Sequence, residues 1–119
     1  LIRRAEEKTK HNQGPHVYLA ISYGGREEIL SAVKKIVAEN PAPSEVTEEY
    51  FDKHLYTAGM PDPDIILRTS GEHRLSGFLP WQSVYSELFF IKTYWPAFSK
   101  EEFAEILDAY ATRERRFGK

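Results

Sequence analysis

The sequence predicts an α/β fold in which a mostly parallel sheet is flanked by helices. Its short apolar runs are typical of strands that are buried on both faces of a sheet. Apolar residues at helical spacing indicate amphipathic helices that would cover such a sheet. Because buried-type strands and helices share one chain, a mostly parallel arrangement is favoured. The predicted strands cover residues 16–22, 64–68 and 87–92.

The first part of the chain predicts a helix, a strand and a second helix. Residues 1–10 are polar and resemble the end of a helix, which a Gly-Pro turn closes. Residues 17–21 form the apolar part of the first strand. From Arg26 the apolar residues fall on one face of a helix, which Asn40 ends. That face comprises Ile29, Leu30, Val33, Ile36 and Val37.

The second part predicts two strands between two helices. Thr47 is a candidate cap for a short helix through about Tyr56. The second strand ends in a turn at residues 69–71, and Ser99 with Glu102 forms a capping box for the last helix. The apolar face of that helix comprises Phe103, Ile106, Leu107 and Tyr110.

Composition limits the function classes. The chain has 119 residues, which fits one domain or a piece of one, and its 41% hydrophobic and 29% charged residues are ordinary for a globular protein. A net charge of -2 argues against a general nucleic-acid binder, whereas local arginine clusters suit a small anion. The absence of cysteine fits a reducing compartment, and neither a membrane-spanning run nor a signal peptide is found.

Two unusual segments follow predicted strands and are expected to meet in one crevice at the C-terminal edge of the sheet. They are residues 23–26 and residues 68–71. The pair Gly24-Gly25 can bring backbone amides to an anion at the start of a helix. Alternatively it is a tight turn whose glycines supply positive φ, which is the commoner case for such a pair.

The loop from Arg68 to Ser76 is a candidate diphosphate cradle. Guanidinium groups match phosphate oxygens, and here two arginines accompany hydroxyl side chains and a histidine. The alternative is a solvated polar loop in which Glu72 pairs with an arginine. The position after a buried strand favours a site.

Glu87 begins an otherwise apolar strand. Its carboxylate could pair with an arginine of the 68–76 loop, or it could hold a magnesium ion bound to a diphosphate. His11, His16 and His54 are expected at the surface or in turns. The aromatic residues are expected to be core more often than ligand wall; these are Phe78, Trp81, Tyr85, Phe89 and Phe90.

Together these segments resemble the cis-prenyltransferases, whose best-known members are undecaprenyl diphosphate synthases. Residues 22–29, SYGGREEI, are similar to the family's Asn-Tyr-Gly-Gly-Arg segment. Residues 64–82, followed by 85–88, resemble its most diagnostic block, and residues 113–118 resemble its C-terminal Arg-x-Gly ending. The resemblance covers essentially the whole chain.

The resemblance implies a transferase that condenses isopentenyl diphosphate with an allylic diphosphate to make a cis-polyprenyl diphosphate. Residues 1–119 are expected to be the C-terminal portion of such a domain, an incomplete single domain that supplies the isopentenyl diphosphate and magnesium side of the site. A homodimer, Mg²⁺ as cofactor, a cytoplasmic location and peripheral membrane contact through the product are also implied.

Site roles are likewise carried over from the family. The residues implied in binding isopentenyl diphosphate are Arg68, Arg74, Leu75, Ser76, Arg116 and Gly118, the last two acting across the homodimer. The residues implied at the magnesium ion are Glu87 and His73.

The family's catalytic aspartate, its allylic phosphate-binding loop and its tunnel walls belong to an N-terminal half. No catalytic residue is therefore expected in residues 1–119, which need that half as a partner and are expected to be inactive alone. Ser22 stands where asparagine is usual in the family, and Gly77 and Pro80 also depart from its common residues. The alternative function is a non-catalytic subunit of a heteromeric cis-prenyltransferase, which need not keep an intact diphosphate cradle.

Overall fold

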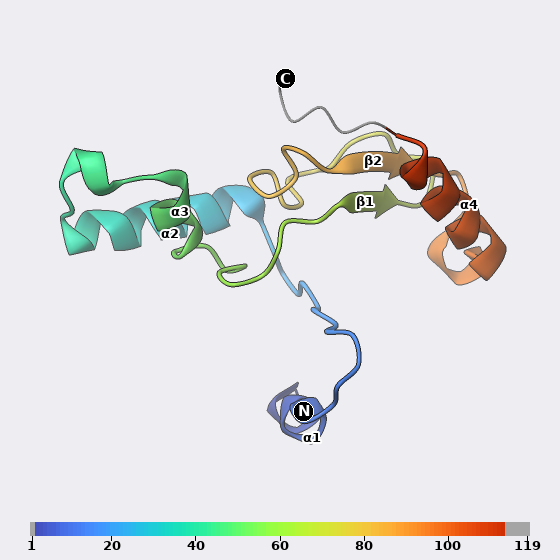
Figure 1. Cartoon of the computed structure of the whole chain (residues 1–119), viewed down its shortest axis with the longest axis horizontal. Coiled ribbons are helices and arrows are strands. Elements are labelled where there is room, and N and C mark those ends of the chain that lie inside the picture. Colours follow the sequence, from blue (N-terminus) through green and yellow to red (C-terminus); the bar gives the residue numbers. More distant parts are fainter. Residues whose placement is uncertain (1, 114–119) are drawn as a thin grey trace.

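The computed structural model describes residues 2–113, and its centre is a two-stranded parallel sheet (Figure 1). Strand β1 covers Ile65–Arg68 and β2 covers Glu87–Phe90. Ile65 pairs with Glu87 and Arg68 pairs with Phe90, so the strands run in the same direction. The predicted α/β class with a parallel sheet is confirmed.

Helices lie at both ends of this sheet (Figure 1). Helix α2 (Gly25–Glu39) and the short helix α3 (Glu48–Asp52) pack against each other at one end, and α4 (Lys100–Ala111) lies beside β2 at the other. Short 3₁₀ turns cover Pro43–Glu45 and Trp95–Ala97. None of the described helices is both long and apolar enough to span a membrane.

The predicted helix caps are present. The hydroxyl of Thr47 accepts a hydrogen bond from the Tyr50 N–H at 3.1 Å, and that of Ser99 accepts from the Glu102 N–H at 3.1 Å. The return half of the predicted capping box is not formed, because the Glu102 carboxylate accepts the Thr93 hydroxyl instead. Helix α3 is shorter than predicted and ends at Asp52.

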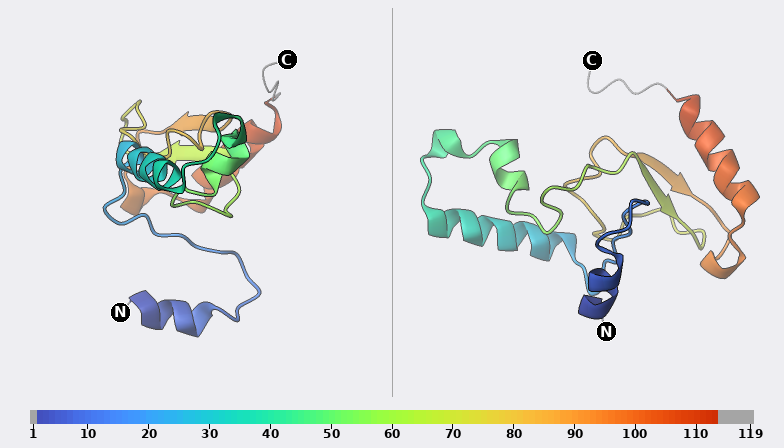
Figure 2. Two further views of the ribbon diagram at one scale, coloured as in Figure 1. Left: turned by 90° about the vertical axis from the view of Figure 1, so that its left-hand side faces the viewer. Right: turned by 60° about the horizontal axis from the view of Figure 1, so that its bottom comes forward.

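The predicted strand at residues 16–22 is wrong for this chain. These residues form neither strand nor helix, and Val17 and Leu19 are each 80% exposed. They extend between α1 (Ile2–Thr9) and the start of α2, away from the sheet (Figure 2). A strand needs a neighbour for its backbone groups, and within residues 2–113 the sheet consists of β1 and β2 paired with each other. The strand prediction failed because it rested on the apolar composition of these residues alone.

The predicted helix faces are also only partly buried. In α2 the buried line is Glu28, Ala32 and Ile36, at intervals of four residues, while Leu30 and Val37 are 59% and 70% exposed. In α4 only Ile106 is buried among the described residues. Within residues 2–113 the remaining buried apolar residues are Leu55 and Ile66. The radius of gyration of 17.2 Å exceeds the roughly 13–14 Å of a compact domain of this length.

Candidate functional site

Arg68 brings the predicted cradle residues together. It is the last residue of β1, and its guanidinium Nη1 donates to the Ser76 hydroxyl oxygen at 2.9 Å and to the backbone carbonyl of Arg74. The loop between them therefore folds back over the end of the strand. Leu75 takes part through its backbone carbonyl, which accepts the Phe78 N–H at 3.0 Å. Arg68, Ser76 and the backbone of Arg74 are therefore brought together, whereas the side chain of Arg74 lies outside this cluster.

The backbone of this loop is unusual. Ser70, Ser76 and Leu79 have φ values of 73°, 51° and 47°, in the left-handed region that non-glycine residues rarely adopt. The loop is tied down at its start, where the Ser70 and Gly71 N–H groups donate to the carbonyls of Thr93 and Ile91 at 3.0 and 2.8 Å. Such conformations persist when surrounding contacts enforce them, and they concentrate at functional sites.

Arg74 directs its charge to the surface. Its guanidinium pairs with the Glu72 carboxylate, and the two side chains are 62% and 43% exposed. This contact is the one that the alternative interpretation of the loop expected. An exposed ion pair contributes little free energy, so a polyanionic ligand can compete with Glu72 for Arg74.

Glu87 and His73 lie at opposite ends of β2. Glu87 is the first residue of the strand and pairs with Arg113, whose guanidinium lies 4.3 Å over the Phe89 ring. His73 stacks on Phe90, the last residue, with ring centroids 5.2 Å apart. Three residues of strand separate these ends by roughly 10 Å.

The described part of the chain holds no group of three His, Cys, Asp or Glu side chains placed to bind one metal ion. Magnesium, however, is commonly bound by one or two carboxylates together with substrate phosphates. Glu87, partly exposed and acidic, fits that donor type as a single ligand.

Gly25 has a role that neither sequence interpretation anticipated. Its N–H is not free for an anion, because it donates to the Gly77 carbonyl at 2.9 Å. Its backbone is not in the positive-φ region either, and Gly24 has a φ of -139°. A Cβ at position 25 would lie 2.1 Å from Pro80 Cδ, so glycine is required by close packing of the helix start against the loop.

Glu28 is a functional candidate that sequence reasoning missed. It is fully buried, and its carboxylate accepts the Tyr23 hydroxyl, the Tyr56 N–H at 2.9 Å and the Gln82 amide at 3.1 Å. Burial, and next the hydrogen bond to Glu28, raise the pKa of Tyr23, so the phenol stays protonated. Only the four-residue spacing from Glu28 to Ala32 and Ile36 could have indicated its burial.

The aromatic residues divide into two groups. Trp81 packs on Phe51 with ring centroids 4.4 Å apart and donates its indole N–H to Asp52 at 2.7 Å, which confirms a packing role. Phe78 and Tyr85 are 42% and 59% exposed, so the expectation of core positions is wrong for them. Phe78 nevertheless contacts Tyr23 edge to face at 5.7 Å.

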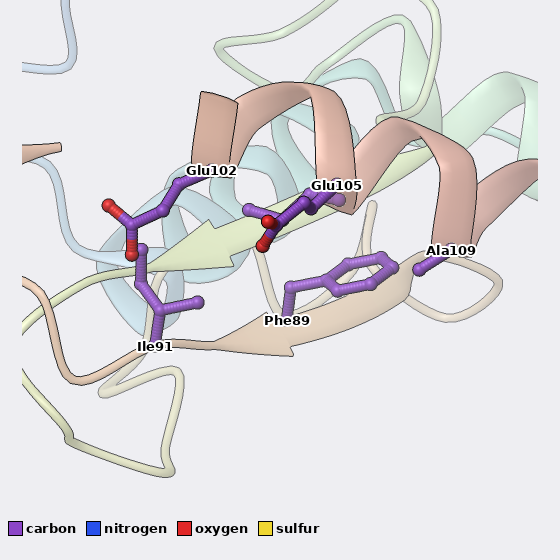
Figure 3. Close-up of a pocket in the computed structure, with 6 residues that line it drawn as sticks. Phe89, Ile91, Glu102, Glu105 and Ala109 are labelled. Carbon is purple, nitrogen blue, oxygen red and sulfur yellow. The ribbon is translucent and has the colours of Figure 1, made fainter. Parts of the chain in front are cut away.

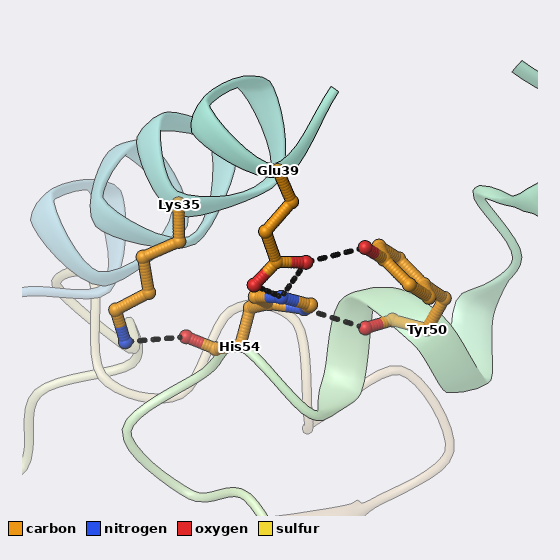
Figure 4. A network of polar contacts seen from close by, with 4 residues as sticks. All are labelled: Lys35, Glu39, Tyr50 and His54. Carbon is orange, nitrogen blue, oxygen red and sulfur yellow. Dashed lines mark hydrogen bonds and ion pairs between the residues drawn. The ribbon is translucent and has the colours of Figure 1, made fainter. Parts of the chain in front are cut away.

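His54 is part of a clamp between α2 and α3 (Figure 4). One ring nitrogen donates to the Tyr50 carbonyl at 2.8 Å and the other contacts the Glu39 carboxylate at 3.0 Å. Lys35 donates to the His54 carbonyl at 3.0 Å. The hydrogen bond to Glu39 is the main cause that raises the pKa of His54. Sequence reasoning assigned this histidine only to a surface or turn.

A cavity of about 150 Å³ lies between β2 and α4, apart from the cradle (Figure 3). Its lining is Phe89, Ile91, Glu102, Glu105, Ile106 and Ala109. Apolar side chains form most of its wall, and two carboxylates lie on the helix side. None of the residues predicted for the site from the sequence lines this cavity.

Arg116 and Gly118, which the resemblance implied in trans, lie outside the described residues. Their role stays a prediction.

Comparison with known proteins adds to this geometry. A family model of undecaprenyl diphosphate synthases matches residues 1–118. An isoprenyl transferase of Thermus thermophilus is 52% identical over 126 residues, covering 99% of this chain and 48% of that protein. The ditrans,polycis-undecaprenyl-diphosphate synthase ((2E,6E)-farnesyl-diphosphate specific) of Micrococcus luteus is 47% identical over 121 residues, covering 98% of this chain and 49% of its own length.

A solved structure shares this fold. The lavandulyl diphosphate synthase of Lavandula x intermedia, crystallised with dimethylallyl diphosphate, superposes with a TM-score of 0.94 at 37% identity. The match covers 99% of this chain and 52% of that one. The chain thus spans about half the length of the relatives it matches.

Proposed function

The chain belongs to the cis-prenyltransferase family, and we propose that it supplies the isopentenyl diphosphate side of a prenyl-chain elongating transferase. That enzyme condenses isopentenyl diphosphate with an allylic diphosphate and releases pyrophosphate. The observation that carries the proposal is the convergence of Arg68, Arg74 and Ser76 at the end of β1.

Arg68 is suited to hold the diphosphate in one orientation. Among the described residues its protein acceptors contact Nη1 alone. A guanidinium has five N–H donors in a rigid fork, so the donors on Nε and Nη2 are available for phosphate oxygens. Because Nη1 is already held by the loop, the fork is positioned before the ligand arrives, which lowers the entropic cost of binding.

Arg74 and Ser76 would complete the cradle. Arg74 would exchange its exposed pair with Glu72 for a charge-assisted contact with phosphate. The Ser76 hydroxyl accepts from Arg68 and can donate its own proton to a phosphate oxygen. The Leu75 backbone would line the same surface.

Magnesium is proposed as the cofactor, with Glu87 as its carboxylate ligand and His73 near it. Bound Mg²⁺ would neutralise charge on the diphosphate oxygens. For Glu87 to take this role, its pair with Arg113 must open. The separation of His73 and Glu87 along β2 means that one chain as folded here would not place both on one ion.

The rest of the reaction is assigned to partners. The catalytic aspartate, the allylic site and the tunnel are proposed to come from the N-terminal half of the same enzyme, and Arg116 with Gly118 to act in trans within a homodimer. By itself the chain is proposed to be inactive. We place the enzyme in the cytoplasm, with membrane contact through its lipid product.

Calorimetric titration of isopentenyl diphosphate, with and without Mg²⁺, tests the proposal. Saturable binding that Mg²⁺ strengthens supports it, whereas no binding at millimolar ligand would overturn it. Turnover assays with the complete enzyme test the alternative function, a non-catalytic subunit. That function is supported if the chain binds no isopentenyl diphosphate but raises the turnover of a catalytic partner.

A further inference from the structure

Glu28 is a fully buried carboxylate that is surrounded by hydrogen-bond donors. It is the largest side chain with no exposure in the described part of the molecule. Burial of a carboxylate is very costly unless hydrogen bonds compensate it. Here three donors from separate segments, Tyr23, Tyr56 and Gln82, contact its two oxygens. The carboxylate therefore joins segments that are far apart in the sequence.

The contacts around Glu28 converge on the loop that follows Ser76. Gln82 is 4% exposed, and its amide bridges Glu28 and the Thr57 hydroxyl, the latter at 2.7 Å. Three residues before Glu28, the Gly25 N–H donates to the Gly77 carbonyl. The start of α2 is thus attached to both ends of the stretch from Gly77 to Gln82.

That stretch is continuous with a strained part of the cradle. Ser76 and Leu79 are non-glycine residues with φ values of 51° and 47°. Left-handed conformations at such residues are held by surrounding contacts rather than by local preference. Ser76 in turn accepts the hydrogen bond from Arg68 at 2.9 Å. Glu28 is therefore connected to Arg68 in three steps. It hydrogen-bonds Gln82, the backbone from Gln82 to Gly77 leads to Ser76, and Ser76 accepts from Arg68.

We propose that Glu28 is a positioning residue for the diphosphate cradle, which acts through Gln82 and the 77–82 stretch to hold Ser76 and thereby Arg68. This inference rests on the proposed function. Both Glu28 oxygens are used inside the protein, so its effect on a ligand would be transmitted through the loop. Loss of the carboxylate would free Gln82 and relax the left-handed backbone at Ser76.

The test variant is Glu28→Gln, and the matched control is Glu27→Gln. Glu27 is the neighbouring carboxylate in the same first turn of α2, and it is exposed. Both changes remove one charge at the same helix end, so any effect of net charge or helix dipole is shared. Only Glu28→Gln replaces a buried acceptor oxygen, of the kind that receives Tyr23 and Gln82, with an amide donor.

Two readouts separate positioning from simple stability. The first is calorimetric affinity for isopentenyl diphosphate with Mg²⁺, measured well below the melting temperature of each variant. The second needs no ligand: NMR of ¹⁵N-arginine-labelled protein reports whether the Arg68 guanidinium N–H signals are ordered. Glu28→Gln should weaken affinity about tenfold or more, because displaced binding groups lose much of their effect. It should also broaden the Arg68 signals, and Glu27→Gln should do neither.

Rescue supplies the decisive comparison. Adding Gln82→Glu to Glu28→Gln exchanges the amide and the carboxylate, so one hydrogen bond between positions 28 and 82 can reform. Affinity and Arg68 signals should return most of the way to those of the wild-type protein.

If Glu28→Gln lowers the melting temperature but leaves affinity and Arg68 order unchanged, the positioning role is excluded. If the wild-type protein binds no isopentenyl diphosphate while Arg68 is still disordered by Glu28→Gln, the proposed function fails but the mechanical link remains.

Discussion

Gly25 and Pro80 lie so close that a Cβ on residue 25 would be 2.1 Å from Pro80 Cδ and 2.5 Å from the Gly77 carbonyl oxygen. These two residues join the first turn of α2 to the loop that carries Ser76. The contact explains why the candidate site is built from a helix start and a loop that are about fifty residues apart in the sequence.

Gly25→Ala should therefore displace the loop as well as destabilise the fold. Neither the ring of Pro80 nor a backbone carbonyl can move aside cheaply, so we expect a loss of roughly 1–3 kcal/mol in unfolding free energy. Urea denaturation measures this loss, and affinity for isopentenyl diphosphate should fall with it. Gly14→Ala is the control, because a Cβ at position 14 would meet no atom within 4 Å. Equal effects of the two changes would contradict the packing role.

Arg74→Ala in the complete enzyme should weaken isopentenyl diphosphate far more than the allylic substrate. A charge-assisted hydrogen bond contributes about 1.5–3 kcal/mol, which corresponds to roughly a tenfold to hundredfold change in affinity. Separate titrations with each substrate measure the two effects. Arg4→Ala, an exposed arginine in α1, controls for net charge. Equal weakening of both substrates would remove Arg74 from the isopentenyl diphosphate site.

Glu87→Gln should shift isopentenyl diphosphate binding to higher Mg²⁺ concentration. The amide keeps the size of the side chain but loses the charge that attracts the cation. Because Glu87 also pairs with Arg113, the control is Arg113→Gln, which breaks the pair and keeps the carboxylate. That control should bind at the same or lower Mg²⁺ concentration. An unchanged magnesium titration of Glu87→Gln would assign Glu87 to the ion pair alone.

The clamp between α2 and α3 should weaken as the pH rises above neutrality. The Glu39 carboxylate raises the pKa of His54, so the folded state holds a proton that the unfolded state releases at lower pH. The stabilisation is complete below the unfolded histidine pKa and is lost as pH rises through the folded value.

Glu39 limits the clamp on the acidic side. Hydrogen bonds from Tyr50 and then His54 lower the pKa of Glu39, so its stabilisation is lost as pH falls through the folded value.

Urea denaturation between pH 6 and 8, a range of about 2 units around the histidine pKa, tests the prediction for His54. The fall in stability over this range should be smaller in His54→Gln and unchanged in His11→Gln; a fall independent of His54 would contradict it.

Local signals predicted most of the fold. Strand β1 and the caps at Thr47 and Ser99 depend on residues adjacent in the sequence, and each appears where predicted. The contact between Arg68 and Ser76 was predicted for a similar reason, since the two residues are only eight positions apart in the sequence. Local backbone preference also explains a departure at Ser22, where asparagine is usual in the family. Its φ of 53° lies in the left-handed region, which asparagine adopts more readily than most residues.

Long-range contacts account for what the sequence did not predict. The burial of Glu28 depends on Tyr56 and Gln82, which are 28 and 54 residues away. The requirement for glycine at position 25 depends on Pro80. Residues 16–22 were predicted to be a strand from their own composition, but a strand also depends on a neighbouring strand.

A crystal structure of the protein with isopentenyl diphosphate and Mg²⁺ tests the central claim most directly. We predict diphosphate oxygens within hydrogen-bonding distance of Arg68, Arg74 and Ser76, with Arg68 still held by the loop through Nη1. A bound diphosphate elsewhere, with Arg74 still paired to Glu72 and facing solvent, would contradict the account.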